Sequence, residues 1–375
     1  MYNKENVSSR TKKKQAKEEC FNRNIPILNI LFYIGKGFML RKQLIVLVRI
    51  FYQIGEHKAN DMISDLLQNG WLIKKQATNT KTCLYILTKY PLSQYYECSS
   101  RDTCSVKLNN RKIWNNIYRT EFIIRQVVPM MEECQTELEL GNLLEFLEKT
   151  SISIFTTENQ ISVYQLYQNL LKNFPIKDKD SILNGLPLES PFFDDFYKVS
   201  ADLYNYQTNF LRYKIEDDTS YNEDVNKKLE REKDVLTSSK EAKMYYYNLF
   251  NMVSSGFFFI GKPNHDEEII IGTFDKCNNM YLKKIYSNCL CIFMMLQRYL
   301  GYYPKITLQV YMSDADNIIS LREKEMQQGF DFGKQEYVGF NKRDTFFYNY
   351  NIPRQYWDYI QVDYIYYPLK EKYNL

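Results

Sequence analysis

The stretch from residue 27 to residue 88 constrains the fold more than any other part of the chain. It begins with three segments whose apolar residues recur at the spacing of helices, separated by glycines. Two short alternating segments typical of strands follow, with a polar turn between them. Helix, helix, helix, strand, turn, strand is the order of a winged helix-turn-helix domain. We therefore predict this fold over residues 23–92.

The three predicted helices span residues 27–34, 41–52 and 56–69. The first is almost wholly apolar, so we expect it to be buried. Residues 35–37, Gly-Lys-Gly, end it because glycine accepts the left-handed conformation of a helix C-cap. Apolar residues in the second recur at three- and four-residue spacings. Gly55 forms the predicted turn between the second and third helices.

The third helix is the predicted base-reading element. Its apolar residues fall on one face and leave a polar face toward solvent. In a helix-turn-helix the N-terminal half of this helix enters the major groove of DNA. Lys58 and Asn60 have the most suitable chemistry, whereas Asp65 and its acidic neighbour four residues earlier oppose tight phosphate contact. The residues expected to meet base edges are His57, Lys58, Asn60, Asp61 and Ser64.

Basic residues outside the third helix form a predicted phosphate-contacting rim. The two strands span residues 71–75 and 82–87, and residues 78–81 supply the polar turn of the wing. The lysines of this hairpin and the start of the second helix suit phosphate oxygens. The residues of the rim are Arg41, Lys42, Lys74, Lys75 and Lys81.

The charge of the chain is unevenly distributed. Residues 1–26 carry seven Lys or Arg against three Glu, and residues 27–89 carry nine against three acids. Since the whole chain has a net charge of +4, the remainder carries −6. A basic first quarter indicates polyanion binding. Residues 1–22 lack apolar periodicity and are predicted to be a disordered basic arm, either neutralising phosphates or solubilising the chain.

Several classes of site are excluded by the residues themselves. The eight cysteines form no CxxC pair, and two histidines are too few to complete a zinc site. No GxxxxGK loop, GxSxG motif or relaxase-type histidine pair is present, so we expect no cofactor, no metal and no catalytic residue. Reduced thiols without a secretory signal predict a cytoplasmic protein. The most apolar run, residues 40–54, is too short and too charged to span a membrane.

Beyond residue 92 the sequence predicts two further regions. A chain of 375 residues is long enough for more than one domain. Residues 93–240 are expected to be mostly helical, with a loop over 93–110, helices over 111–131 and 137–149, and a charged linker over 214–243. The linker is poor in apolar residues, which places the next boundary near residue 240.

Residues 241–375 form a predicted C-terminal α/β domain. A strand, strand, helix, strand, helix order favours a mixed sheet with helices against it. Aromatic segments such as 346–350 and 356–359 are expected to form strands or hairpins that cover this sheet. The fold class predicted for the chain is α+β. The expected elements are helix 243–253, strand 256–260, turn 262–266, strand 268–273, helix 280–300, strand 304–312 and helix 316–325.

Two motifs carry a resemblance to a known family. They are Asp61-Met-Ile-Ser-Asp-Leu-Leu-Gln-Asn-Gly-Trp-Leu-Ile and Leu84-Tyr-Ile-Leu-Thr88, followed much later by a hairpin, a helix, the strand 305–312 and a helix. This layout resembles the replication-relaxation proteins encoded on plasmids and conjugative elements of Gram-positive bacteria. The resemblance covers the winged helix and, more loosely, the C-terminal segment, but not residues 93–240. It implies a DNA-binding accessory protein with a restriction-endonuclease-like C-terminal domain.

An active nuclease domain would need two acids and usually a lysine around a divalent metal. The nearest approach combines Asp266, Glu267 or Glu268 with Asp275 and Lys276. The second strand lacks an Asp/Glu-x-Lys triplet, so we expect a degenerate nuclease-like scaffold without catalysis.

The primary hypothesis is a non-enzymatic protein that binds double-stranded DNA in the replication or mobilisation of a plasmid or other mobile element. Its further partners would be a replication or relaxosome protein, or a second copy in a homodimer, and no membrane. One alternative is a metal-dependent nuclease using the C-terminal acids. Another is a winged-helix transcriptional repressor, and a third is a winged helix that binds protein rather than DNA.

Overall fold

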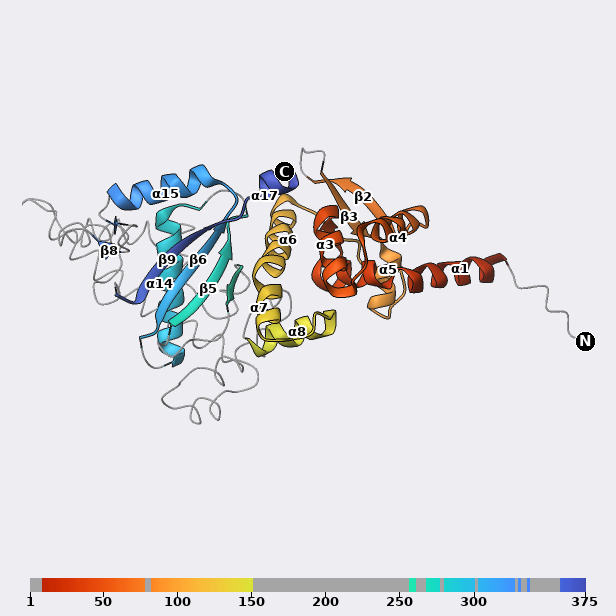
Figure 1. Ribbon diagram of the computed structural model, residues 1–375, viewed down its shortest axis with the longest axis horizontal. Helices are drawn as coiled ribbons and strands as arrows, with labels where there is room; N and C mark the ends of the chain where they lie inside the picture. Colours follow the sequence, from red (N-terminus) through yellow and green to blue (C-terminus); the bar gives the residue numbers. More distant parts are fainter. Residues whose placement is uncertain are drawn as a thin grey trace, which may run out of the picture. The chain divides into compact units, whose positions relative to one another are not determined.

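The computed structural model of the protein describes residues 9–77, 82–150, 256–260, 268–276, 280–300, 303–327, 330–331, 336–337 and 358–375. The chain divides into two compact units (Figure 1). Unit 1 comprises Met1–Leu147 and Pro368–Leu375, and unit 2 comprises Glu148–Tyr367. This division differs from the predicted boundary at residue 92. The predicted boundary near residue 240, and the linker that suggested it, lie outside the described residues.

Unit 1 contains the predicted helices and strands of residues 27–88 and one additional strand, β1. The sequence does not predict β1, because a strand of only three residues, all of them buried, shows no alternating pattern. The strands form an antiparallel sheet in the order β1-β3-β2. The elements are α1 (Ser9–Arg23), α2 (Ile25–Asn29), the π-helical turn η1 (Ile30–Ile34), β1 (Phe38–Leu40), α3 (Arg41–Tyr52), α4 (Glu56–Gln68), β2 (Leu72–Gln76) and β3 (Cys83–Leu87).

The turn between α3 and α4 lies where the sequence predicts it. The residue with the unusual backbone conformation in this turn is not Gly55. Gln53 caps α3 in the left-handed conformation, with φ of 54°. Gly55 is extended, with φ of −66°, and precedes the first residue of α4. An added Cβ at Gly55 would meet nothing within 4 Å. The prediction that Gly55 makes the turn is therefore corrected, because Gln53 carries the unusual backbone conformation.

The prediction of a disordered arm over residues 1–22 is wrong from residue 9 onward, where α1 begins. The last turn of α1 is anchored to the body of unit 1. Cys20 is buried, and the ring of Phe21 lies 5.4 Å from that of Trp71 between centroids. Residues 15–19 are exposed, so within the part of α1 whose burial the structure describes, the buried contacts begin at Cys20. These distant contacts leave no periodic pattern in the sequence.

The helices that follow β3 also belong to unit 1. They are α5 (Lys89–Tyr95), α6 (Asn110–Phe122), the π-helical turn η2 (Ile123–Val127), α7 (Val128–Glu133), α8 (Leu140–Lys149) and, from the far end of the chain, α17 (Leu369–Tyr373). α6 packs on the first elements: Nε2 of Gln43 donates to the carbonyl oxygen of Ile117 at 2.9 Å. The guanidinium of Arg119 donates to the carbonyl oxygen of Ile34 at 2.7 Å. The first residues of the predicted loop over 93–110 belong to the end of α5. The predicted helices over 111–131 and 137–149 are confirmed, the first as α6, η2 and α7 and the second as α8.

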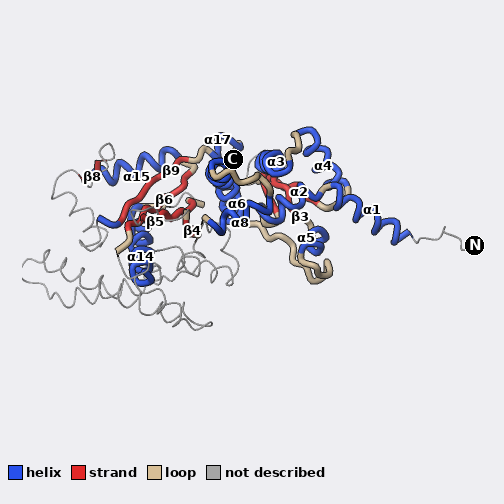
Figure 2. Tube along the Cα trace, turned by 60° about the horizontal axis from the view of Figure 1, so that its bottom comes forward, coloured by secondary structure: helices blue, strands red, loops and turns tan. Residues whose placement is uncertain are grey.

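Unit 2 is built on a four-stranded mixed sheet, which confirms the α+β class (Figure 2). Its order is β4-β5-β6-β9, in which β4 is antiparallel to β5 and the other neighbours are parallel. The elements are β4 (Phe257–Phe259), β5 (Glu268–Phe274), α14 (Leu282–Leu300), β6 (Lys305–Met312), α15 (Ala315–Gln327), the short strands β7 (Phe330–Asp331) and β8 (Glu336–Tyr337), and β9 (Ile360–Tyr366).

The prediction of aromatic strands or hairpins covering the sheet is corrected for β9, the part of this segment that the structure describes as a strand. β9 is itself a strand of the sheet, paired along its length with β6, and the chain then returns to unit 1 as α17. The predicted helix 243–253, turn 262–266 and aromatic segment 346–350 lie outside the described residues. No helix among those the structure describes is long and apolar enough to cross a membrane.

A buried carboxyl group joins three elements of unit 2. Glu325 of α15 is 1% exposed. Its Oε1 accepts hydrogen bonds from the hydroxyl of Tyr286 on α14 at 2.9 Å and from that of Tyr364 on β9 at 2.6 Å. Burial raises the pKa of Glu325 to about 7, although the two tyrosine hydrogen bonds oppose the rise.

Glu325→Gln is expected to stabilise unit 2 at alkaline pH. In the unfolded chain this carboxyl ionises near its ordinary pKa of 4.5, whereas in the folded protein it ionises near 7. Stability is therefore lost as pH rises between these values, by about 3 kcal/mol. Glutamine keeps an acceptor for the tyrosines and carries no charge. Urea unfolding at pH 4.5 and pH 8 should show the variant losing less stability than wild type, and exposed Glu323→Gln should behave as wild type. Equal pH dependence of Glu325→Gln and wild type would contradict this account.

Candidate nucleic-acid interface

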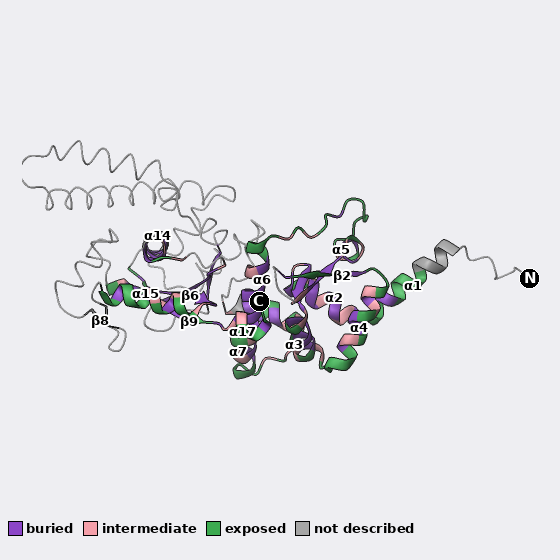
Figure 3. Ribbon diagram, turned by 90° about the horizontal axis from the view of Figure 1, so that it is seen from above, coloured by how far each residue is buried: buried purple, intermediate pink, exposed green. Residues whose placement is uncertain are grey.

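Helices α3 and α4 carry most of the predicted DNA contacts. α3 starts at Arg41 directly after β1, and the buried residues of α4 are apolar, as its spacing predicts. The opposite face of α4 is open to solvent (Figure 3). On this face His57, Lys58, Asp61 and Ser64 are exposed, and Asn60 is half-buried.

Arg41 and Asn60, predicted to contact phosphate and base respectively, are hydrogen-bonded to each other. Nη2 of Arg41 donates to Oδ1 of Asn60 at 2.8 Å. The same nitrogen lies 3.8 Å from Oε1 of Glu56. These contacts tie the first turn of α3 to the first turns of α4. A change at Asn60 therefore also changes the surroundings of Arg41.

Asp65, the third acid on α4, faces α1. Its Oδ2 accepts hydrogen bonds from Nδ2 of Asn24 at 2.7 Å and from Nη2 of Arg23 at 3.1 Å. The hydrogen bond from Asn24 is the main reason why the pKa of Asp65 lies below its ordinary value, and Arg23 adds to the effect. The charge of Asp65 is thus compensated by α1, while Asp61 stays exposed.

Lys74 and Lys75 lie on β2, at one edge of the sheet, and both are exposed. Successive side chains of a strand point to opposite faces. The two lysines therefore leave the sheet on opposite sides, and the predicted rim is not one continuous row. Lys81 and the rest of the predicted wing turn, residues 78–81, lie outside the described residues.

α17 meets this surface from a distant part of the chain. Nζ of Lys42 donates to the main-chain oxygen of Lys372 at 3.1 Å. Oγ1 of Thr82, just before β3, donates to the main-chain oxygen of Tyr373 at 2.6 Å. The structure thus places the predicted phosphate ligand Lys42 in a hydrogen bond within the protein. Sequence reasoning missed Thr82 and α17, because 330 positions separate Lys42 from Lys372.

Glu121 on α6 holds α17 in place. Its side chain is fully buried and accepts hydrogen bonds from Nε of Arg125, Nζ of Lys372 and the hydroxyl of Tyr373. Burial alone would raise the pKa of Glu121, but the hydrogen bonds from Lys372, Tyr373 and Arg125 outweigh it and lower the pKa. Glu121 is therefore ionised at neutral pH. A lone acid in a helix with basic and apolar neighbours is the only trace of this network in the sequence.

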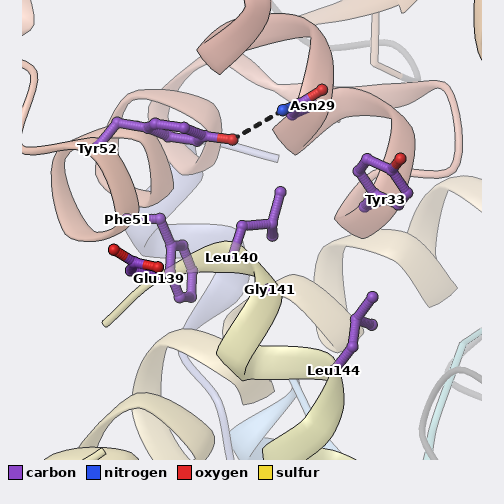
Figure 4. A pocket seen from close by; sticks show the side chains of 8 residues that line it. All are labelled: Asn29, Tyr33, Phe51, Tyr52, Glu139, Leu140, Gly141 and Leu144. Atoms are coloured by element: carbon purple, nitrogen blue, oxygen red, sulfur yellow. Dashed lines mark hydrogen bonds between the residues drawn. The ribbon is translucent and has the colours of Figure 1, made fainter. Parts of the chain in front are cut away.

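A groove of about 580 Å³ lies elsewhere on unit 1, between η1, the end of α3 and the start of α8 (Figure 4). Nδ2 of Asn29 donates to the hydroxyl of Tyr52 at one side of it, at 3.0 Å. Tyr33 and Leu144 are 43% and 44% exposed. No predicted DNA contact lines the groove, whose residues are Asn29, Tyr33, Phe51, Tyr52, Glu139, Leu140, Gly141 and Leu144.

The acids considered for a nuclease do not form a metal centre in the part of unit 2 that the structure describes. Glu268 begins β5 and accepts a hydrogen bond from Thr307, whereas Asp275 follows the end of the same strand and is buried. At the rise of a strand, roughly 20 Å separate their main chains. No group of three or more His, Cys, Asp or Glu side chains in the described ranges is placed to hold a metal ion. Asp266 and Glu267 lie outside those ranges.

Comparison with known proteins adds no constraint. The chain shows no significant match to a family model, to a curated protein or to a solved structure. The candidate interface is therefore defined by geometry: the exposed face of α4, the start of α3 and the exposed lysines of β2.

Proposed function

We propose that unit 1 is a winged-helix domain that binds double-stranded DNA through α3, α4 and β2. The single observation that carries this proposal is the exposed polar face of α4, which includes Lys58, beside the exposed lysines of β2. A helix order of α2, α3, α4 around a β1-β3-β2 sheet supports it. The charge of +6 over residues 27–89 suits a polyanion.

The contacts fall into two groups with different roles. Lys58 and Asn60 have side chains that hydrogen-bond base edges in the major groove. Arg41, Lys74 and Lys75 present donors that suit phosphate oxygens. Because Arg41 is bonded to Asn60, its engagement with a phosphate would release the Asn60 carbonyl oxygen for other contacts. The proposed contacts to the DNA backbone outnumber the proposed contacts to bases, so we expect modest sequence specificity.

In the cell, the proposed role is that of an accessory protein in the replication or mobilisation of a plasmid or related element. The resemblance to replication-relaxation proteins supports this role. Unit 2 would be a nuclease-like scaffold without catalysis that binds a replication or relaxosome protein. Strong Mg²⁺-dependent DNA cleavage that disappears in Asp275→Ala would favour a nuclease instead, and promoter-only binding would favour a repressor.

The double change Lys58→Ala and Asn60→Ala is expected to remove sequence preference. A preferred duplex is first selected from a random pool with the wild-type protein. Removing each base-reading side chain should weaken binding to this duplex by about 1–3 kcal/mol, while binding to unselected DNA changes little. Fluorescence anisotropy with both duplexes measures the difference. Lys107→Ala, at an exposed position of unit 1 that was not predicted to contact DNA, combined with Glu145→Ala on α8, serves as a control for surface change. Equal weakening on both duplexes would assign these residues to the DNA backbone rather than to the bases.

The groove beside η1 and α8 favours a second function, protein binding. Its exposed Tyr33 and Leu144 are apolar groups of the kind that protein partners cover. If unit 1 fails to bind duplex DNA at low salt, this surface becomes the better candidate for its activity. Leu144→Asp would then reduce binding of the partner without affecting the exposed face of α4.

A further inference from the structure

We propose that segment 368–375 caps a phosphate-binding position formed by Lys42 and Thr82, and that DNA binding requires the segment to move away. This inference rests on the proposed function, because it concerns regulation of the same surface. Lys42 lies in the first turn of α3, which is assigned to DNA, and Thr82 precedes β3, the strand that pairs with β2. No local sequence pattern predicts this role for segment 368–375.

The two donors are close neighbours at one end of the sheet of unit 1. Leu40, the last residue of β1, pairs with Leu84 of β3. The chain entering α3 after β1 and the chain entering β3 therefore meet at this end. The main-chain nitrogen of Ala77 donates to the oxygen of Thr82 at 2.8 Å, which joins the chain leaving β2 to the chain entering β3 at this end. Lys42, in the first turn of α3, and Thr82, just before β3, thus lie at the same end of the sheet.

The groups that now fill this position are carbonyl oxygens from the end of α17. Lys42 donates to the oxygen of Lys372 at 3.1 Å. Thr82 donates to the oxygens of Tyr373 and Asn374, at 2.6 Å and 3.1 Å. The last carbonyls of a helix carry partial negative charge. They therefore satisfy the same ammonium and hydroxyl donors that phosphate oxygens would satisfy.

A phosphate can displace these carbonyls because it offers the stronger interaction. A phosphate carries a full negative charge, so its hydrogen bond with the ammonium of Lys42 includes an attraction between opposite charges that a neutral carbonyl oxygen does not offer. Lys42 is exposed, so a phosphate can approach it from solvent. The segment then determines how readily the position opens, since only molecules with the segment displaced offer both donors to DNA.

The attachment of the segment is separate from the donors that it covers. Leu369 and Tyr373 are buried, and the Tyr373 hydroxyl donates to Glu121. The amides of Lys372 and Leu375 donate to the oxygens of Pro368 and Lys370, both at 3.0 Å. The segment can therefore be loosened at Leu369 and Tyr373 without altering Lys42 or Thr82.

The test compares full-length wild type with the double variant Leu369→Ala and Tyr373→Ala on a labelled duplex of random sequence. Loosening the segment should tighten DNA binding by at least about threefold. Leu321→Ala, a change at a buried residue of α15 in unit 2, controls for general destabilisation and should leave affinity unchanged. Hydrogen exchange on wild type provides a second reading that does not depend on a variant folding. DNA should accelerate exchange at residues 369–375.

Each outcome supports or overturns the cap. Faster exchange at 369–375 in the wild-type complex supports it, and tighter binding by the double variant adds to that support. If wild type binds DNA but exchange there is unchanged or slower, the segment stays in place and the cap is overturned. If wild type does not bind duplex DNA at all, the proposed function fails, and the cap fails with it.

Discussion

Glu121→Ala is expected to lower the free energy of unfolding of unit 1 by about 3 kcal/mol. The carboxylate is fully buried and is the shared acceptor of Arg125, Lys372 and Tyr373. Its removal leaves the Tyr373 hydroxyl buried without this acceptor and opens a small cavity. Arg125 and Lys372 are 37% and 39% exposed, so water can solvate them in the variant. The expected loss of stability therefore lies at the lower end of the range found when one partner of a buried ion pair is removed.

Urea unfolding at several pH values measures this effect. Because the folded protein lowers the pKa of Glu121, the stability it supplies is present above the ordinary value of 4.5 and is lost as pH falls through the lower folded pKa. The difference between wild type and Glu121→Ala should thus shrink in acid. Glu132→Ala, at an exposed position of α7, should match wild type throughout. A difference between wild type and Glu121→Ala that is absent at neutral pH would contradict the network.

The combined change Lys74→Glu and Lys75→Glu is expected to weaken binding to duplex DNA of any sequence by about 100-fold at moderate salt. Each substitution removes a cation from the exposed edge strand β2 and places an anion near phosphate. Since the two side chains point to opposite faces, the single variants should differ. The one on the DNA-facing side should account for most of the weakening.

Anisotropy titrations of the double variant and both single variants measure this effect. Lys107→Glu is the matched control for each single variant, because it makes the same charge change at an exposed residue of unit 1. Its neighbour Val106 lies against Gly37, beside the start of β1, away from the end of the sheet that holds Thr82. Lys107→Glu should bind like wild type. Similar weakening in the control and in both single variants would show that net charge, and not the β2 surface, determines binding.

The helices and strands of residues 27–88 are predictable because their apolar spacing is local. α4 shows this best: the polar positions between its apolar residues identify the face that the structure exposes. The same holds for β5, α14 and β6, whose apolar runs predict the mixed sheet of unit 2. β1 is not predictable in this way, because three residues are too few for a period to appear.

The contacts that modify the candidate interface are not predictable, because they join residues far apart in sequence. The spacing of α4 places Asp65 on its polar, solvent-facing side, whereas in the structure Arg23 and Asn24 donate hydrogen bonds to it. The position of Lys42 at the start of α3 predicts a phosphate contact, but the sequence does not predict that its Nζ donates to the main-chain oxygen of Lys372 on α17. A sequence pattern shows which residues share a face of one element, but not which distant segment covers that face.

The most direct test of the central claim is the salt dependence of duplex DNA binding by the full-length protein and by Lys74→Ala with Lys75→Ala. If unit 1 binds the phosphates of the DNA backbone, the logarithm of the wild-type association constant should fall linearly with the logarithm of the salt concentration. The variant should show a shallower slope, by about 1 for each phosphate that it no longer neutralises. No wild-type binding at low salt, or equal slopes for the two proteins, would contradict the account.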